Sequence, residues 1–183
     1  TRDGEEKLLL DMLNKIQTAN ALAVIVPRHP QRFNEVAELL KANDIAFQRR
    51  SDNAIIAPTT QVVLGDSMGE MFAYFAASDV AFIGGSLLPL GGQNLIEACA
   101  VGTPVLIGPH TFNFAEATEQ AIACGAARRV LDGAELSKEI DSLFADAAQR
   151  QAMAAAGLAF TARHRGAAER AYALVSSLLE RQA

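Results

Sequence analysis

The sequence predicts an α/β fold in which a parallel sheet is flanked by helices. Short runs rich in Val, Ile, Leu and Phe alternate with longer segments whose apolar residues recur at helical spacing. Such alternation is typical of strand–helix units, whose strands run parallel. The 183 residues are 50% hydrophobic and 20% charged, which suits one globular domain with a buried core. We therefore expect residues 1–183 to form a single domain.

The first half of the chain contains the signals of two helices and three strands. Asp3 and Glu6 have capping-box spacing and precede apolar residues at 8, 9, 12, 13 and 16, which predicts the first helix. Pro27 stops the strand that comes next. The strands are expected at 22–26, 45–48 and 61–64, with a helix across 33–40 and a loop across 51–60.

The second half repeats strand, glycine turn and helix. The strands are expected at 80–83, 104–107 and 128–131, and the helices at 70–77, 93–101, 114–124, 136–144 and 147–183, with a break near Gly166. Helix 70–77 is apolar on nearly all sides, so we expect it to be covered on more than one side. Asp132 and Glu135 form a second capping box before the helix that follows.

Charge and residue types exclude several classes of function. The net charge of −5 argues against nucleic acid as a partner, so an anion site would have to be built locally. Cys99 and Cys124 lie in alanine-rich apolar stretches, where we expect reduced thiols, with Cys99 buried. No apolar run is long enough to cross a membrane. The three histidines have no acidic or cysteine companions at ligand spacing, so no metal site is expected. No cofactor is expected either.

Glycines cluster where three of the expected strands end, at Gly65, Gly84-Gly85 and Gly108. Ligands of open parallel sheets bind outside the carboxyl ends of the strands. Segment 84–97 runs from a glycine turn through a second glycine pair into the expected helix, whose free N–H groups would attract an anion. The segment therefore predicts a phosphate site, although it lacks the Lys of a P-loop and the dinucleotide-binding glycine pattern. An ordinary strand–helix turn is the alternative.

Helical phasing places Asn94 and Glu97 on one side of helix 93–101, and Leu95, Ile96 and Cys99 on the other. The apolar side would then pack on the sheet, and the polar side would face the ligand. A carboxylate one turn beyond a phosphate is suited to accept hydrogen bonds from a ribose diol. The alternative is that Glu97 only favours the helix dipole.

Five segments together resemble the Kdo (3-deoxy-D-manno-octulosonic acid) transferases of bacterial lipopolysaccharide synthesis. They are 1–6 (TRDGEE), 27–30 (PRHP), 65–70 (GDSMGE), 77–86 (ASDVAFIGGS) and 102–114 (GTPVLIGPHTFNF). The resemblance covers nearly the whole chain and is weakest after about residue 132. This sequence departs from the family pattern at Gln93, where many relatives carry His.

The resemblance implies the C-terminal, Rossmann-like half of a GT-B glycosyltransferase, which holds the donor CMP-Kdo. It also implies that an N-terminal domain, absent from this chain, supplies the lipid A precursor site, a membrane anchor and a catalytic carboxylate. The reaction would be inverting and metal-independent, at the cytoplasmic face of the inner membrane. The chain alone would be soluble and inactive, with no catalytic residue of its own. A strand would be expected just before Thr1, central in the sheet.

The resemblance and side-chain chemistry together suggest which residues bind the donor. Phosphate and sugar contacts are expected from Ser86, Gly91, Gly92, Gln93 and Asn94, and a ribose contact from Glu97. Arg28 would neutralise the donor's negative charge, with a solvated loop cation as the alternative, and His29 beside it is either a ligand or a turn residue. Met68-Gly69 would lie under the cytosine while Glu70 caps its own helix; a simple helix start is the alternative.

Further polar residues have less definite roles. His110 and Asn113 would either contact Kdo or order their loop, and Asp66 would accept hydrogen bonds in a turn. The basic stretch at 163–170 is either a solvated face or a contact with the missing domain or anionic lipid. Two other functions remain open. One is a nucleotide-sugar epimerase of the same fold, which a CMP-against-UDP binding comparison would separate; the other is a non-enzymatic nucleotide-binding module.

Overall fold

The computed structural model describes residues 1–164 and Tyr172. The expected α/β architecture with parallel strands is present, but the strands form two three-stranded sheets where one was expected. The first sheet has the order β1-β3-β2, made of Ala23–Ile25, Val62–Leu64 and Phe47–Arg49. The second has the order β4-β5-β6, made of Ala81–Ile83, Val105–Ile107 and Ala127–Arg129. All four strand pairs are parallel.

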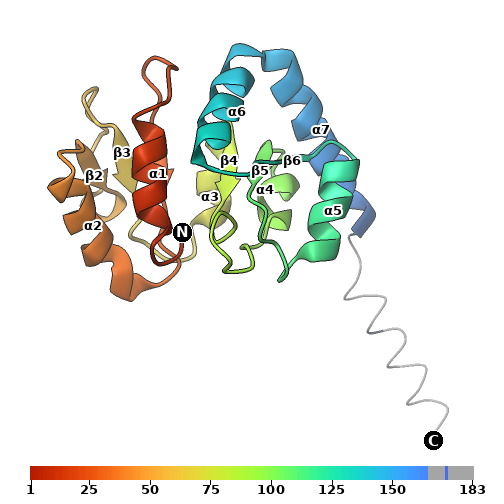
Figure 1. Cartoon of the computed structure of the whole chain (residues 1–183), viewed down its shortest axis with the longest axis horizontal. Helices are drawn as coiled ribbons and strands as arrows, with labels where there is room; N and C mark the ends of the chain where they lie inside the picture. Colours follow the sequence, from red (N-terminus) through yellow and green to blue (C-terminus); the bar gives the residue numbers. More distant parts are fainter. Residues whose placement is uncertain (165–171, 173–183) are drawn as a thin grey trace, which may run out of the picture.

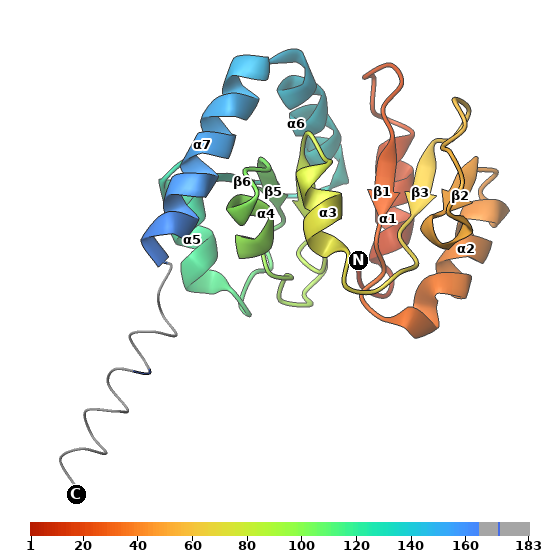
Figure 2. The same ribbon diagram turned by 180° about the vertical axis from the view of Figure 1, so that it is seen from behind.

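Helices flank the two sheets (Figures 1 and 2). They are α1 (Glu5–Leu13), α2 (Phe33–Ala42), α3 (Met71–Ala76), α4 (Ile96–Ala100), α5 (Ala115–Ala123), α6 (Gly133–Ala145) and α7 (Ala147–His164), with short 3₁₀ turns at Pro30–Arg32 and Arg50–Asp52. The break expected near Gly166 lies outside the described residues. Among the helices of the described part, none has the length and apolar character needed to cross a membrane.

Helix α1 connects the two sheets through its apolar residues. Leu10 packs into the core of the first sheet with Leu40, whereas Leu9 and Met12 pack into the second with Leu106. The capping box expected at Asp3 and Glu6 is wrong, because the helix is capped by Gly4 and no side chain caps it. The Glu5 and Glu6 side chains turn inward and are almost fully buried.

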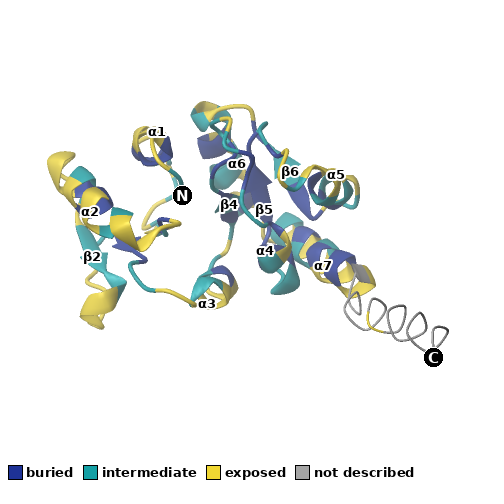
Figure 3. Cartoon of the chain, turned by 90° about the horizontal axis from the view of Figure 1, so that it is seen from below, coloured by how far each residue is buried: buried dark blue, intermediate teal, exposed yellow. Residues whose placement is uncertain are grey.

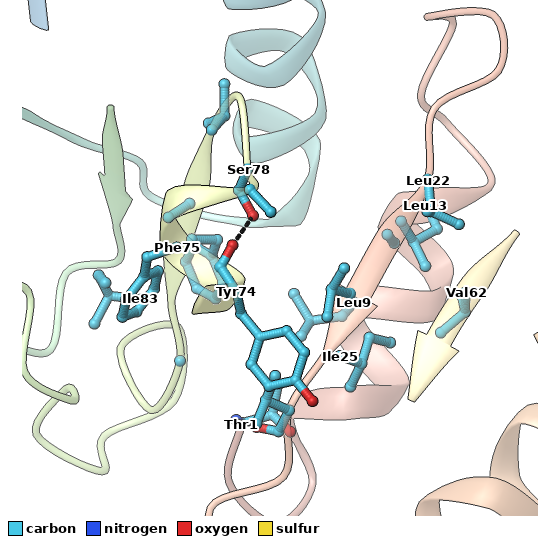
Figure 4. Close-up of a pocket in the computed structure, with 18 of the residues that line it drawn as sticks. Thr1, Leu9, Leu13, Leu22, Ile25, Val62, Tyr74, Phe75, Ser78 and Ile83 are labelled. Carbon is cyan, nitrogen blue, oxygen red and sulfur yellow. Dashed lines mark hydrogen bonds between the residues drawn. The ribbon is translucent and has the colours of Figure 1, made fainter. Parts of the chain in front are cut away.

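The edge strands β1 and β4 face each other across a cavity of about 1420 Å³, to which residues of both strands contribute. No backbone pairing joins them in the described part of the chain. Helices α1 and α3 lie on opposite sides of the space between the sheets (Figure 3). Leu9, Leu13 and Ile25 reach the cavity from one side, and Phe75 and Ile83 from the other (Figure 4).

Thr1 continues the hydrogen-bond pattern of β1 beyond its carboxyl end. Its amino group donates to the Val26 carbonyl, and its carbonyl accepts from the Arg28 N–H at 3.0 Å. This alternation is that of a parallel ladder. Thr1 therefore occupies the position of a strand residue between the two sheets at their carboxyl ends.

Two helices of the second half differ from the sequence expectation. Helix α3 is covered on one side only, with Phe75 buried and Phe72 54% exposed, so the expectation of cover on several sides is wrong. Helix α4 begins at Ile96 instead of residue 93, because the preceding glycine loop bonds back to the turn after β4.

Other expectations for the second half are confirmed. The capping box before α6 forms, with Asp132 accepting from the Glu135 N–H at 2.8 Å. Cys99 is fully buried, and burial, with Cys124 nearby, raises the pKa of its thiol to about 11.

Candidate functional site

The cavity between the sheets brings together most of the residues predicted to bind a ligand. They come from loops at the carboxyl ends of β1, β3 and β4, where parallel sheets bind ligands. The predicted residues that line it are Arg28, Met68, Gly69, Glu70, Gly92, Gln93, Asn94 and Glu97. His29, Ser86 and Gly91 do not line it.

The glycine turn after β4 already holds a carboxylate. Glu5 is fully buried, and its two oxygens accept the Gly85 N–H at 2.7 and 2.6 Å; one also accepts the Ser86 N–H at 3.2 Å. Gly85 has φ of +75°, which turns consecutive amides to one side and creates an anion-binding concavity. The protein's own side chain fills this concavity, so a ligand phosphate cannot use it while Glu5 stays in place.

Ser86 was predicted to contact phosphate, but the structure places it inside the fold. The residue is fully buried, and its hydroxyl donates to the Ile83 carbonyl and accepts the Gly108 N–H at 2.8 Å. These bonds hold the ends of β4 and β5 together. Ser86 therefore has a structural role in the turn, which corrects the prediction that it contacts the ligand directly.

The amides of Gly92 and Gln93 are also used within the protein. The Gly92 N–H donates to the Gly85 carbonyl at 2.8 Å, and the Gln93 N–H to the Gly84 carbonyl at 3.0 Å. The prediction of free amides is therefore wrong for Gly92 and Gln93, and the helix begins at Ile96, beyond both. The Gln93 side chain nevertheless lines the cavity, so its amide group remains in a position to meet a ligand.

Gly91 shapes the loop and does not line the cavity. Its φ is +89°, and a Cβ there would lie 2.3 Å from Asn113 Nδ2. Asn113 in turn donates to the Leu90 carbonyl at 3.3 Å and to the Gly92 carbonyl at 3.4 Å. Asn113 thus orders the glycine loop, which was one of its two expected roles, and it also lines the cavity.

Asn94 and Glu97 share one face of the α4 region, as helical phasing predicts. Asn94 Oδ1 accepts the Ile96 N–H at 3.0 Å, and its amide donates to Glu97 Oε1 at 3.1 Å. Leu95 and Cys99 are fully buried on the opposite face, whereas Ile96 is 37% exposed and does not follow the prediction. The Asn94 bond fixes the Glu97 carboxylate toward the cavity and leaves its second oxygen without a protein donor in the described part.

Arg28 and His29 follow β1 and have different surroundings. The Arg28 side chain is exposed at the cavity, and its guanidinium has no ion pair with any described residue. His29 is exposed, and its carbonyl accepts the Arg32 N–H at 3.0 Å in a 3₁₀ turn. The structure therefore gives His29 the geometry of the turn residue.

The loop after β3 is ordered by its own polar side chains. Glu70 accepts from the Ser67 hydroxyl and from Arg50 Nη2 at 3.0 Å, and the Ser67 bond contributes most to the lowered pKa of Glu70. Asp66 accepts from the Ser51 N–H at 2.8 Å and from Arg49, so it is a hydrogen-bond acceptor, but for the 3₁₀ turn at Arg50–Asp52 and not within its own turn. Met68, 63% exposed, presents an apolar side chain at the cavity.

Arg2, for which the sequence pattern predicts no role, also lines this cavity. Its side chain approaches the glycine turn so closely that a Cβ on Gly85 would lie 3.2 Å from Arg2 Cγ. Residues 2 and 85 are distant in the chain, and no local spacing relates them. The prediction missed Arg2 because only the fold brings it to the site.

Comparisons with known proteins agree with this geometry. No protein-family model matches the chain. It is 48% identical to the 3-deoxy-D-manno-octulosonic acid transferase of Bordetella pertussis over 176 residues, which is 93% of this chain. It is 39% identical to the protein of the same name from Haemophilus influenzae over 184 residues, which is 99% of this chain. It spans only 41% and 43% of the length of these two relatives.

A solved structure extends the likeness to three dimensions. The C-terminal CMP-Kdo binding domain of WaaA from Acinetobacter baumannii superposes with a TM-score of 0.82 at 32% sequence identity. The match covers 87% of this chain and 84% of that domain. The sequence resemblance, the parallel α/β architecture and this superposition agree, and the chain belongs to the 3-deoxy-D-manno-octulosonic acid transferase family.

Proposed function

We propose that this chain binds CMP-Kdo and is the donor-binding part of an enzyme that transfers Kdo. The observation that carries the proposal is the likeness to a CMP-Kdo binding domain over 87% of the chain. The cavity at the carboxyl ends of the strands supports it, because it is lined by eight of the residues that the sequence predicts to bind the donor. The relatives described above carry the transferase name, which lends no support to an epimerase.

The nucleoside would lie between the loop after β3 and the start of α4. We propose that Met68 and Gly69 lie under the cytosine, with Glu70 holding their loop through Ser67 and Arg50. Glu97 would accept the ribose hydroxyls. Its orientation by Asn94 supports this role, because a carboxylate fixed in advance loses less conformational freedom on binding.

The anionic part of the donor would lie toward β1 and the glycine turn. We propose that Arg28 and the side chains of Gln93 and Asn94 contact it, with Gly92 permitting close approach. Ser86, Gly91 and His29 would act indirectly, by holding the loops that carry these contacts. A charge-assisted bond from arginine is about twice as strong as a neutral hydrogen bond, so Arg28 should dominate recognition of the phosphate.

The whole enzyme would need a second half. We propose that an N-terminal domain carries the lipid A precursor site, the catalytic carboxylate and the membrane anchor. The reaction would invert the anomeric centre without a metal, at the cytoplasmic face of the bacterial inner membrane. This chain alone would hold the donor and transfer nothing, because one wall of the cleft would be missing.

The sheet would also be completed in the longer protein. We propose that a strand preceding Thr1 lies between β1 and β4 and joins the two sheets into one. It would fill the part of the cavity between these edges and leave the loops at the carboxyl ends of the strands to the nucleotide. The parallel-ladder bonds of Thr1 to Val26 and Arg28 support this arrangement, as do the two facing sheet edges.

Calorimetric titration of the chain with CMP, UMP and cytidine tests the proposed ligand. We expect CMP to bind more tightly than UMP. Because the two differ only in the base, the difference in affinity measures recognition of cytosine. We also expect CMP to bind more tightly than cytidine, because only CMP carries the phosphate. Preference for UMP would favour the epimerase, and absence of binding to any of the three would refute a donor site in this chain.

A further inference from the structure

Arg2 and Arg28 are the arginines of the described part whose guanidinium groups make no ion pair or hydrogen bond. The other described arginines are Arg32, Arg49, Arg50, Arg128, Arg129, Arg150 and Arg163, and each bonds to a carboxylate or to backbone carbonyls. Both unpaired arginines line the same cavity. Unpaired cations that converge on a cavity indicate a site for an anion.

The backbone fixes the two arginines beside each other. The Arg28 N–H donates to the carbonyl of Thr1 at 3.0 Å, and Arg2 is the residue that follows Thr1. On the other side, the Arg2 stem and the Gln93 amide both flank Gly85. A Cβ on this glycine would lie 3.2 Å from Arg2 Cγ and 3.5 Å from Gln93 Nε2. Arg2 thus follows the residue that bonds to Arg28, and its stem lies against the same glycine as the Gln93 amide.

The local charge balance explains why a second cation is needed here. The amides of the β4 turn, which would otherwise attract a phosphate, are occupied by the buried Glu5 carboxylate. The amides of Gly92 and Gln93 are bonded to carbonyls. These four amides therefore offer no positive charge to an approaching phosphate, and the chain as a whole carries a net charge of −5. Cationic side chains at the cavity can supply the charge that these amides do not.

We propose that Arg2 is a phosphate-binding residue, and that Arg2 and Arg28 both bind the phosphate of the nucleotide from the side of β1. This assignment rests on the proposed function and names a further residue of that site. The Arg2 stem packs on Gly85, which orients the guanidinium group before the ligand arrives. The planar guanidinium offers paired donors that match two phosphate oxygens, which a lysine ammonium does not.

The test is to measure binding of CMP and cytidine to the wild-type chain, Arg2→Met, Arg28→Met and Lys7→Met. Methionine keeps an unbranched stem against Gly85 and removes only the charged end. Lys7 is exposed on α1, so Lys7→Met is the matched control for loss of one positive charge. Far-ultraviolet circular dichroism and thermal melting verify the fold of each variant, and Arg2→Lys serves as a second variant that retains the charge.

We expect Arg2→Met to weaken CMP about tenfold to a hundredfold and to leave cytidine unchanged within about twofold. Arg2→Lys should lose less than Arg2→Met, and Lys7→Met should bind CMP like the wild type. If Arg2→Met binds CMP as tightly as the wild type does, or loses CMP and cytidine equally, the assignment of Arg2 is overturned while the proposed function stands. If the wild-type chain binds neither compound, the proposed function itself fails, and the assignment fails with it.

Discussion

Replacement of Glu5 by alanine should destabilise the chain severely. The Glu5 carboxylate is fully buried, and it accepts the amides of Gly85 and Ser86 at distances of 2.6 to 3.2 Å. Hydrogen bonds to a charged group contribute roughly 1.5–3 kcal/mol each, so loss of two of them should cost about 3–6 kcal/mol. A domain has only about 5–15 kcal/mol in total, so this loss is a large share.

The reason for the large effect is the place of Glu5 in the fold. It connects α1 to the end of β4, and its neighbour Glu6 connects the same helix to Arg32, with an oxygen–nitrogen distance of 2.8 Å. The two carboxylates therefore hold α1 between the sheets. Alanine would leave buried amides unpaired at the glycine turn, and water has little access to them.

Urea unfolding followed by circular dichroism measures the effect as a change in the free energy of unfolding. Glu5→Gln keeps a carbonyl acceptor of the same length and should lose about half as much as Glu5→Ala. Glu38→Ala removes an exposed carboxylate from α2 and should change stability by less than about 0.5 kcal/mol. If Glu5→Ala unfolds within about 1 kcal/mol of the wild type, the carboxylate does not hold the turn and the reasoning is refuted.

Four further outcomes are expected. The wild-type chain should bind CMP more tightly than 2′-deoxy-CMP, and Glu97→Gln should remove most of that preference; a mutant with the full preference would show that Glu97 does not contact the ribose. Gly91→Ala should lower the melting temperature more than Gly69→Ala, because both have positive φ but only Gly91 has Asn113 Nδ2 within 2.3 Å of the added Cβ; equal shifts would count against this crowding. Hydrogen bonds, first of all that from Thr18, lower the pKa of the Asp141 carboxyl in the folded chain, so as the pH falls this carboxyl is protonated in the unfolded chain before it is protonated in the folded chain. Asp141 therefore adds to the free energy of unfolding above about pH 4, and this addition is lost below that pH. Urea unfolding at several pH values should show that Asp141→Asn lacks this pH-dependent part, and a pH profile of stability equal to that of the wild type would argue against it. The buried Cys99 thiol, whose pKa is about 11, should react with a thiol reagent at pH 8 only after unfolding, and fast reaction in the folded chain would contradict its burial.

The spacing of apolar residues along the chain predicts the strands and helices well, because this spacing depends only on residues that are neighbours in the sequence. The strand at 104–107 and the helix at 114–124 appear in the structure within one residue at each end. Phasing likewise placed Asn94 and Glu97 on the side of the cavity. These successes rest on side-chain periodicity, which the sequence displays directly.

The remaining features depend on contacts between distant residues. Glu6 has the spacing of a helix cap, but it pairs with Arg32, which no local pattern foretells. The amides of Gly92 and Gln93 were expected to be free, yet they bond to carbonyls of the turn after β4. The role of Glu5 in that turn, and the approach of Arg2 to it, follow only from the packing of α1 between the two sheets.

The measurement that tests the central claim most directly is a nuclear magnetic resonance titration of the ¹⁵N-labelled chain with CMP. We expect saturable shifts of the backbone amides of Gly69, Gln93 and Asn94, which line the cavity between the sheets. Cys124 and Ala152 line a separate groove, so the resonances of their amides should stay unchanged. Saturable shifts at that groove with none at the cavity, or no saturable shift anywhere, would contradict the proposal that this cavity binds the nucleotide of the donor.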